Sequence, residues 1–179
     1  HQSASTMNLI RSLIMQGFTD INQIKAWEKF FLDNRVLEKN RVIISKDTRL
    51  SGYLFEPLMA SGLVSMGMDV ILTGPLPTPA LPILITSLRA DMGVMITASH
   101  NTYEYNGLKF FDSNGNKLSK ELENKIENIV LNVDEYNKIM TRGFKTGKAT
   151  RFDDTVSRYS EYLKLSIEKN TNFKNIKVI

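Results

Sequence analysis

The sequence predicts a single α/β domain in which helices cover both faces of a mixed, mostly parallel sheet. Three strand-like apolar runs lie at 41–45, 69–72 and 91–96, and a helical pattern separates each run from the next. Strands that alternate with helices are typical of parallel sheets, because the crossover helix returns the chain to the same end of the sheet. A length of 179 residues suffices for one well-filled domain, or at most two small ones.

The first forty residues predict helices rather than strands. Residues 1–7 resemble an expression remnant and are set aside. A short apolar helix is expected over 8–17. A second helix begins near Asp20 with a capping-box pattern and continues to about Asp33, with its aromatic side chains on one face. The segment 34–40 then links these helices to the first confident strand.

The middle of the chain carries clear signals for where helices begin and end. A helix is expected from about Gly52 to Met66, and Gly67 follows at a position where left-handed backbone geometry is common. The segment 74–79 contains three prolines and predicts irregular structure, because each proline fixes φ and removes a hydrogen-bond donor. A further helix is expected over 80–88.

The remaining elements follow a hairpin. An Asn-Gly turn at 114–115 predicts arms at 108–112 and 117–118. We expect the domain to span 8–174, with 175–179 opening a truncated second domain. Within the domain we predict a helix over 119–131 and a loop or edge strand over 140–150. A further helix is predicted from Asp153, with Val156, Tyr159, Tyr162 and Leu163 on one face. Residues 177–179, in the final segment, are predicted to begin a strand.

Composition limits the kinds of site that the chain can hold. It has no cysteine and only two histidines, which excludes disulfides, thiolate metal sites and multi-histidine metal sites. No apolar run approaches the roughly 20 residues of a membrane span, so we expect no membrane partner. The net charge of +4 is scattered without a basic run, which favours a small anion such as a sugar phosphate over nucleic acid.

Polar segments follow the first three strands at 46–52, 74–79 and 97–106. In parallel sheets, ligands bind beyond the carboxyl ends of the strands. We therefore expect these three segments to lie at one edge of the sheet, although they are far apart in the sequence.

The third of these segments carries the main candidates for chemistry. Ser99 follows a buried strand, His100 is next to it, and Lys109 lies in the following strand. A serine can carry a transferred group, while lysine or histidine can move protons. Each residue also has an ordinary interpretation: a loop serine that bonds its own backbone, a packed histidine, and an outward-facing strand lysine.

Thr97-Ala98-Ser99-His100-Asn101, followed by Asn106-Gly107-Leu108-Lys109, closely resembles the phosphoserine loop of the α-D-phosphohexomutases. The stretches Lys46-Asp47-Thr48-Arg49-Leu50-Ser51-Gly52 and Gly74-Pro75-Leu76-Pro77-Thr78-Pro79-Ala80 resemble the phosphoglucosamine mutase branch of that family. The resemblance runs from about Arg41 to the end, and it covers one domain, the first, of a family that normally has four.

The resemblance implies a phosphoserine at Ser99, which gives its phosphoryl group to one sugar hydroxyl and takes back another. It implies a proton-transfer role for Lys109 and a supporting role for His100, which would contact phosphate or orient the loop. Arg49 and Asn101 are candidates for phosphate binding. Arg49 could instead form a structural clamp with Asp47, and Asn101 could hold the loop backbone; both alternatives stay open.

The resemblance also implies Mg²⁺, a hard cation that takes oxygen ligands, with the phosphate on Ser99 supplying one of them. The other ligands in the family come from an Asp-Gly-Asp loop that is absent from this sequence. Two departures are notable. Thr102 stands where the family commonly has proline, and no Gly-Thr-Asp-Gly-Ile-Arg-Gly-type segment occurs within 1–40.

The resemblance therefore implies a cytoplasmic, magnesium-dependent enzyme that converts glucosamine 6-phosphate to glucosamine 1-phosphate, and we expect this chain to be inactive alone. One alternative is a phosphomannomutase or phosphoglucomutase of the same family. Another is a non-catalytic α/β module that binds an anion or a partner protein. A homodimer is expected if the chain exposes an apolar surface.

Overall fold

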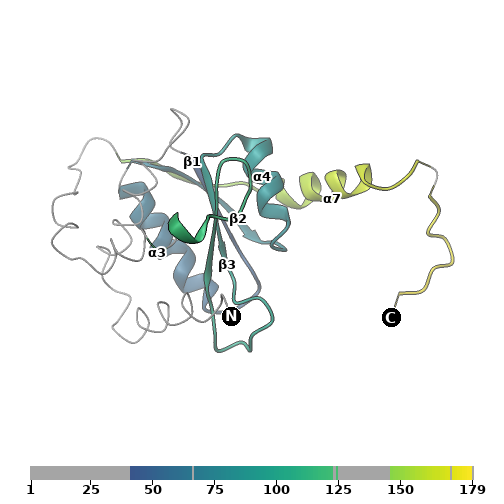
Figure 1. Ribbon diagram of the computed structural model, residues 1–179, viewed down its shortest axis with the longest axis horizontal. Helices are drawn as coiled ribbons and strands as arrows, with labels where there is room; N and C mark the ends of the chain where they lie inside the picture. The colour runs from purple at the N-terminus through teal and green to yellow at the C-terminus, as the bar shows by residue number, and fades with distance from the viewer. Residues whose placement is uncertain (1–40, 66, 123, 125–145, 170, 179) are drawn as a thin grey trace.

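The computed structural model describes residues 41–65, 67–122, 124, 146–169 and 171–178. The helices predicted over 8–17 and 20–33, the linker after them, and most of the helix predicted over 119–131 lie outside these residues. In the described part, a five-stranded sheet has the strand order β4-β3-β1-β2-β5 (Figure 1). Only the pair β3–β4 is antiparallel, so the predicted mixed, mostly parallel sheet is confirmed.

The order of elements along the chain follows the predicted alternation. The strands are β1 (Arg41–Lys46), β2 (Asp69–Pro75), β3 (Met92–Ile96), β4 (Leu108–Phe111) and β5 (Ala149–Arg151), and the helices are α3 (Gly52–Ser65), α4 (Ala80–Leu88) and α7 (Thr155–Leu165). The predicted hairpin is present, because Phe111 of β4 bridges Lys117 across a turn in which Gly115 has a φ of 79°.

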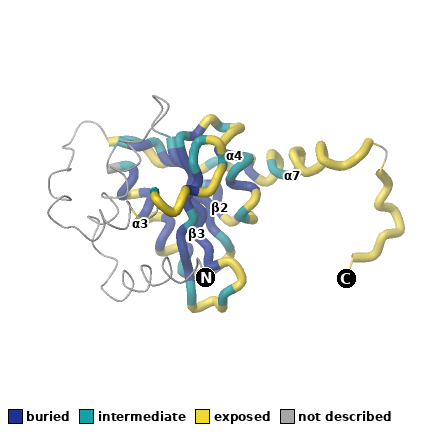
Figure 2. The backbone as a smooth tube through the Cα atoms, in the orientation of Figure 1, coloured by how far each residue is buried: buried dark blue, intermediate teal, exposed yellow. Residues whose placement is uncertain are grey.

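Helices cover both faces of the sheet, and each face has its own apolar cluster. On one face α3 contributes Phe55, Met59, Ala60 and Leu63, which pack against the side chains of β1, β2, β3 and β4. On the other face α4 contributes Ala80, Leu81, Leu84 and Ile85. Alternate residues of β1 divide between them: Ile44 packs on the α3 side and Ile43 on the α4 side. Figure 2 shows the sheet between these helices as the most buried part of the fold.

The carboxyl ends of the three parallel strands β1, β2 and β3 are aligned, as predicted. Lys46, the last residue of β1, pairs with Pro75 of β2 on one side and with Ile96 of β3 on the other. The chain leaves all three strands at this edge. Backbone bonds continue past the ladder, from Asp47 N to Ile96 O at 3.0 Å and from Leu76 N to Lys46 O at 2.9 Å. Segments that are far apart in the sequence therefore meet here.

The structure differs from several predicted bounds, and the predicted strand at 177–179 is not formed at 177–178. Strand β2 continues through Gly74 and Pro75, which we expected to be irregular. The register shifts between Ile44 and Lys46, and Gly74 has a φ of 73° there, so the strand accommodates its proline at an irregularity in the ladder. Helix α7 begins at Thr155 rather than Asp153.

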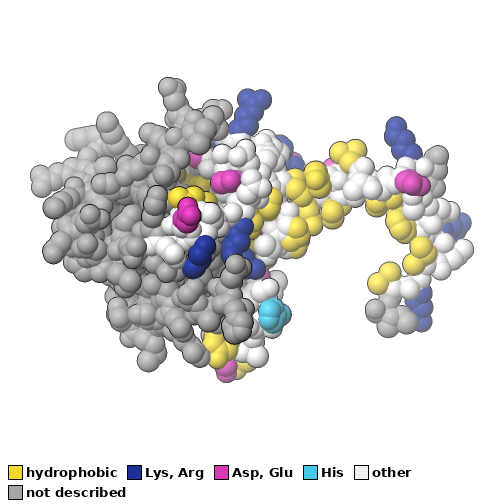
Figure 3. Space-filling model, in the orientation of Figure 1, with side chains coloured by type: hydrophobic (Ala, Val, Ile, Leu, Met, Phe, Trp, Pro, Cys, Tyr) yellow, Lys and Arg dark blue, Asp and Glu magenta, His cyan; other side chains and the backbone are white. Residues whose placement is uncertain are grey.

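Helix α7 leaves the body of the fold after its first turn (Figure 1). Thr155 is buried, and Tyr159 packs against the cluster beneath α4. Further along the apolar face that the sequence predicts, Tyr162 is 51% exposed and Leu163 is 43% exposed. Apolar side chains along α7 are visible in Figure 3. No helix among the described residues is both long enough and apolar enough to cross a bilayer.

Replacing Gly147 by alanine is expected to destabilise the fold by about 1–3 kcal/mol or more, because of overpacking against rigid backbone. A Cβ at this position would lie 2.0 Å from the carbonyl oxygen of Met68, just before β2. Urea unfolding of the variant measures the loss. Gly52→Ala is the matched control, since its Cβ would meet only side-chain atoms of Lys46, the nearest at 3.3 Å. Equal stability of the two variants would contradict the prediction.

Candidate functional site

The candidate site lies at the carboxyl edge of the parallel strands, where the segment after β1 meets the loop between β3 and β4. We call the stretch 97–107 the site loop. Its two ends are fixed by the sheet, and Thr97 N donates to Gly107 O at 2.8 Å. The loop therefore closes on itself at its base and projects its middle residues outward.

Ser99 is exposed in the site loop, three residues beyond the end of β3. Its backbone lies in the left-handed region with a φ of 57°, which is uncommon for a residue other than glycine. Its N–H donates to Thr97 Oγ1 at 3.0 Å, a local bond that supports this conformation. The fold thus leaves the Ser99 side chain at the surface while holding its backbone.

Thr97 connects Ser99 to the segment after β1. Thr97 is buried, and its hydroxyl donates to Asp47 Oδ2 at 2.7 Å. Because the hydroxyl has a single proton, it accepts from Ser99 N with a lone pair. Asp47 therefore sets the orientation of the Thr97 hydroxyl, and the oxygen of that hydroxyl accepts the hydrogen bond from the backbone N–H of Ser99.

Arg49 fills the space between the two segments with its guanidinium, and its side chain is only 11% exposed. Nε donates to Asp47 Oδ2 at 2.9 Å. Nη1 donates to the carbonyl oxygens of Thr102 and Tyr105, and Nη2 donates to those of Ser99 and Asn101. These five bonds use all five N–H donors of the guanidinium. This geometry favours the clamp with Asp47 over phosphate binding by Arg49.

The other predicted site residues lie around this clamp. His100 is exposed next to Ser99, and Asn101 is half-buried, with its backbone in the turn closed by Asn101 N and Ala98 O at 3.1 Å. Lys109 is half-buried in β4 opposite Met95 of β3. As alternation predicts, its neighbours Leu108 and Phe110 pack in the α3 cluster, so Lys109 lies on the other face.

Asn106 anchors the far end of the site loop to α3. It is buried, its Nδ2 donates to Ser51 Oγ at 2.8 Å, and its Oδ1 accepts from Gly107 N at 2.9 Å. The side chain of Asn106 thus ties the end of the site loop to the start of α3.

Sequence reasoning missed a buried ion pair directly behind the site. Lys46 Nζ lies 2.5 Å from Glu56 Oε2 of α3, and the two side chains are 2% and 6% exposed. The ammonium also lies 3.6 Å from the centre of the Tyr53 ring. Alternation contained the signal, because Lys46 has the same parity in β1 as Val42 and Ile44, which pack in the α3 cluster.

The site within the described residues offers hydroxyl, amine, imidazole and backbone groups at its surface. No group of three or more histidine, cysteine, aspartate or glutamate side chains gathers in this part of the chain to hold a metal ion. Figure 3 shows lysine and arginine side chains spread over the visible face rather than gathered in one patch.

The sequence matches the family described as phosphoglucomutase/phosphomannomutase, alpha/beta/alpha domain I, over residues 10–137. It is 44% identical over 149 residues to a phosphoglucosamine mutase from Thermodesulfovibrio yellowstonii, covering 83% of this chain and 33% of that protein. It is 48% identical over 141 residues to a phosphoglucosamine mutase from Parvibaculum lavamentivorans, covering 79% of this chain and 31% of that protein.

Among solved structures, the fold is similar to that of a putative phosphomannomutase from Thermus thermophilus. The TM-score is 0.68 and the identity 29%, over 85% of this chain and 32% of that one. The chain therefore spans about a third of the length of the relatives that it matches.

Proposed function

Because this chain belongs to the phosphoglucomutase/phosphomannomutase family and matches its domain I, we propose that Ser99 carries a phosphoryl group that is exchanged with a sugar phosphate. The observation that carries the proposal is the position of Ser99. Its side chain is exposed at the edge of the sheet, while Thr97, Asp47 and Arg49 hold its backbone in a left-handed conformation.

The proposed reaction has two balanced transfers. In the first, a sugar hydroxyl oxygen bonds to the phosphorus on Ser99, the bond from phosphorus to Ser99 Oγ breaks, and the hydroxyl proton passes by way of a base to Ser99 Oγ. In the second, Ser99 Oγ gives up that proton as it bonds to the other phosphorus of the bisphosphorylated sugar, and the proton passes to the sugar oxygen whose bond to phosphorus breaks. The sum is an isomerisation that consumes no further reactant. Such transfers depend mainly on alignment and on neutralisation of charge.

We assign the proton transfer to Lys109. It lies in the strand paired with β3, near the end from which the site loop leaves, and its half-buried position supports a role beyond that of a solvated lysine. His100, next to Ser99 and exposed, would contact the phosphoryl group. Asn101 would either contact the phosphoryl group beside His100 or hold the loop backbone. Arg49 would hold Asp47 and the site loop together.

The substrate that the relatives favour is glucosamine 6-phosphate, converted to glucosamine 1-phosphate, since the two relatives described above are named phosphoglucosamine mutases. A mannose or glucose phosphate is the second candidate, supported by the likeness to the putative phosphomannomutase. The match covers about a third of each of these relatives, so we expect the chain alone to show no turnover. The cytoplasmic location and the homodimer stay predictions.

Magnesium is the expected cofactor, and phosphoryl oxygens on Ser99 are ligands of the kind it prefers. Bound there, it would neutralise charge on the transferring group. The described residues provide no cluster of carboxylates or histidines to complete such a site, so this part of the chain does not fit the ion by itself. The proposal for this chain is limited to Ser99 as one ligand through its phosphate.

The experiment that tests the proposal uses a full-length protein carrying this chain, either its natural form or a hybrid with the remainder of the Thermodesulfovibrio yellowstonii relative. Intact mass followed by peptide mapping is expected to find one phosphoryl group on Ser99. Coupled assays with glucosamine, mannose and glucose phosphates then identify the sugar. Absence of both phosphorylation and turnover would leave a non-catalytic module as the better explanation.

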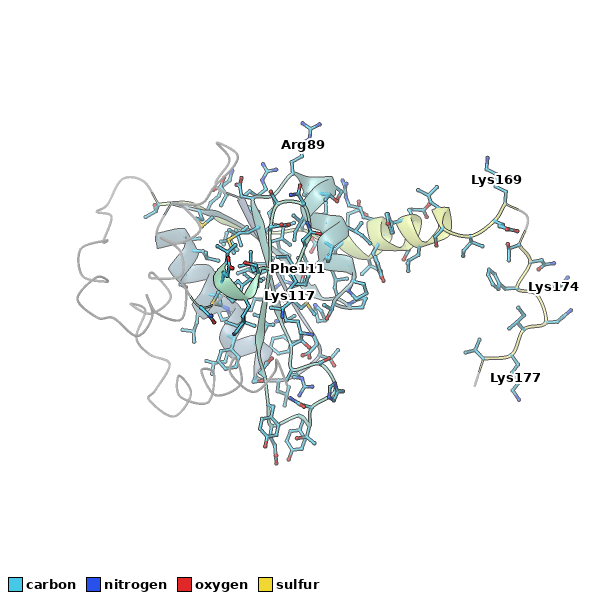
Figure 4. The ribbon with its side chains drawn as sticks, in the orientation of Figure 1. Arg89, Phe111, Lys117, Lys169, Lys174 and Lys177 are labelled. Carbon is cyan, nitrogen blue, oxygen red and sulfur yellow. The ribbon has the colours of Figure 1, made fainter. Side chains whose placement is uncertain are left out.

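Replacing Lys109 by methionine in that full-length protein is expected to lower kcat by roughly 10²–10⁴-fold, the usual contribution of a positioned acid–base group. Methionine keeps the length of the stem and removes only the amine. The steady-state rate measures the loss. Lys117→Met is the matched control, and its rate is expected to stay near that of the wild type. Lys117, labelled in Figure 4, is exposed in the second arm of the hairpin. A normal rate for the Lys109 variant would exclude its assigned role.

A further inference from the structure

We propose that Arg49 is a positioning residue that turns the carbonyl groups of the site loop inward, so that the backbone N–H groups of His100, Thr102 and Tyr103 face outward and bind the phosphoryl group on Ser99. The inference rests on the proposed function, because it needs a phosphoryl group at that serine.

The first step concerns the carbonyl groups. Arg49 Nη2 lies 3.1 Å from the carbonyl oxygen of Ser99 and 2.7 Å from that of Asn101. Arg49 Nη1 donates to the carbonyl oxygen of Thr102. With the carbonyl oxygen of Tyr105, which also accepts from Nη1, four peptide groups of one short loop point their oxygens at a single guanidinium that is largely shielded from solvent.

The second step follows from the geometry of the peptide bond. The described part of the chain contains no cis peptide bond. In a planar trans peptide, the carbonyl oxygen of one residue and the N–H of the next point in opposite directions. The N–H groups of His100, Thr102 and Tyr103 therefore point away from the guanidinium of Arg49.

The third step concerns the partners of these N–H groups. Other amides in the loop are already used: Ser99 N donates to Thr97 Oγ1, Asn101 N to Ala98 O and Tyr105 N to Thr102 O. The N–H groups of His100, Thr102 and Tyr103 have no acceptor among the described residues, and the three residues are exposed. Among the loop amides without an acceptor, these three belong to exposed residues and directly follow carbonyl groups that Arg49 binds.

The chemistry of the remaining donors suits a phosphoryl group. Successive backbone N–H groups form anion-binding concavities, and a phosphoserine carries about −1.5 to −2 charges near neutral pH. The N–H of His100 belongs to the peptide that directly follows Ser99, within reach of a group on its Oγ. Arg49 has no free donor and is paired with Asp47 at 2.9 Å, so it acts by arranging the loop.

The test installs phosphoserine at position 99 during translation and records amide and phosphorus NMR spectra across a pH titration. We expect the amide proton signals of His100, Thr102 and Tyr103 to move downfield as the phosphate ionises. We also expect the phosphate pKa to lie below about 6, its ordinary value, because hydrogen bonds favour the charged form. Unmoved amide signals, or a pKa equal to that of a short reference peptide, would overturn the proposal.

Arg49→Lys separates geometry from charge, because lysine keeps the positive charge and loses the five-donor fork. The phosphate pKa is expected to rise toward about 6 in this variant. The other charged or titratable side chains of this region, those of Asp47, His100, Glu104 and Lys109, are unchanged in both variants. They therefore do not account for a difference in the phosphate pKa. Arg89→Lys is the control, since Arg89 is exposed and points away from the body of the fold in Figure 4. An unchanged pKa in the folded Arg49 variant would exclude the positioning role.

The wild-type spectra decide the question even if the Arg49 variant fails to fold. Since the phosphoserine is built in during translation, the result does not depend on whether the protein phosphorylates itself or turns over a sugar. Failure of the amide contacts and failure of the proposed function are therefore separate outcomes.

Discussion

Replacing Ser99 by alanine is expected to lower mutase turnover of a full-length protein carrying this chain by roughly 10³-fold or more, the scale seen when a covalent nucleophile is removed. The physical reason is that alanine has no oxygen to accept or return the phosphoryl group. Stability should change little, because the structural bonds of this residue come from its backbone N–H and carbonyl oxygen. Steady-state rates and urea unfolding measure the two effects.

Ser87→Ala is the matched control for this variant. Ser87 is an exposed serine of α4 whose hydroxyl donates to Leu84 O at 3.3 Å within the helix. We expect its turnover to equal that of the wild type. Comparable rates for the Ser99 and Ser87 variants would mean that the hydroxyl at position 99 does not carry the group.

Replacing Lys46 by methionine is expected to lower the free energy of unfolding by about 3–5 kcal/mol, the scale for removing one partner of a buried ion pair. Methionine fills a similar volume but leaves the carboxylate of Glu56 buried without a counterion. That carboxylate has no spare partner in the described part of the fold, where its Oε1 already lacks a hydrogen bond. Urea unfolding at neutral pH measures the loss.

A double variant and a surface pair complete this experiment. Adding Glu56→Leu to Lys46→Met removes both charges, and we expect most of the lost stability to return, because apolar replacement of a buried pair is often neutral or better. Lys164→Met breaks an ion pair whose partners, Lys164 and Glu161, are 68% and 70% exposed. It should change stability by less than about 0.5 kcal/mol. A small effect of Lys46→Met alone would contradict the prediction.

Much of the fold follows from local patterns in the sequence. The apolar runs predict the strands because buried strands need continuous apolar side chains, and Gly67 marks the end of α3 with a φ of 86°. The continuation of β2 through Pro75 could not be foreseen. It depends on an irregular pairing with β1, which only the assembled sheet determines.

For the candidate site too, the sequence predicts some features, and only the folded structure determines others. The motif identifies Ser99, His100 and Lys109 because their types and spacing are visible in the sequence. The function of Arg49 was open between two interpretations, because the deciding acceptors are backbone oxygens some fifty residues away. Such partners have no signature in the identity of the side chains. The exposure of Tyr162 and Leu163 likewise depends on how far α7 extends past the sheet.

The bonds from Arg49 to the site loop have a consequence for hydrogen exchange. They join segments separated by 50–56 residues, so they form only when β1 and β3 are already side by side. The loop then belongs to the same cooperative unit as the central strands, and its local opening is costly. Amides at its base, such as that of Thr97, should exchange nearly as slowly as those of β1, which would make this surface segment as persistent as the interior of the sheet.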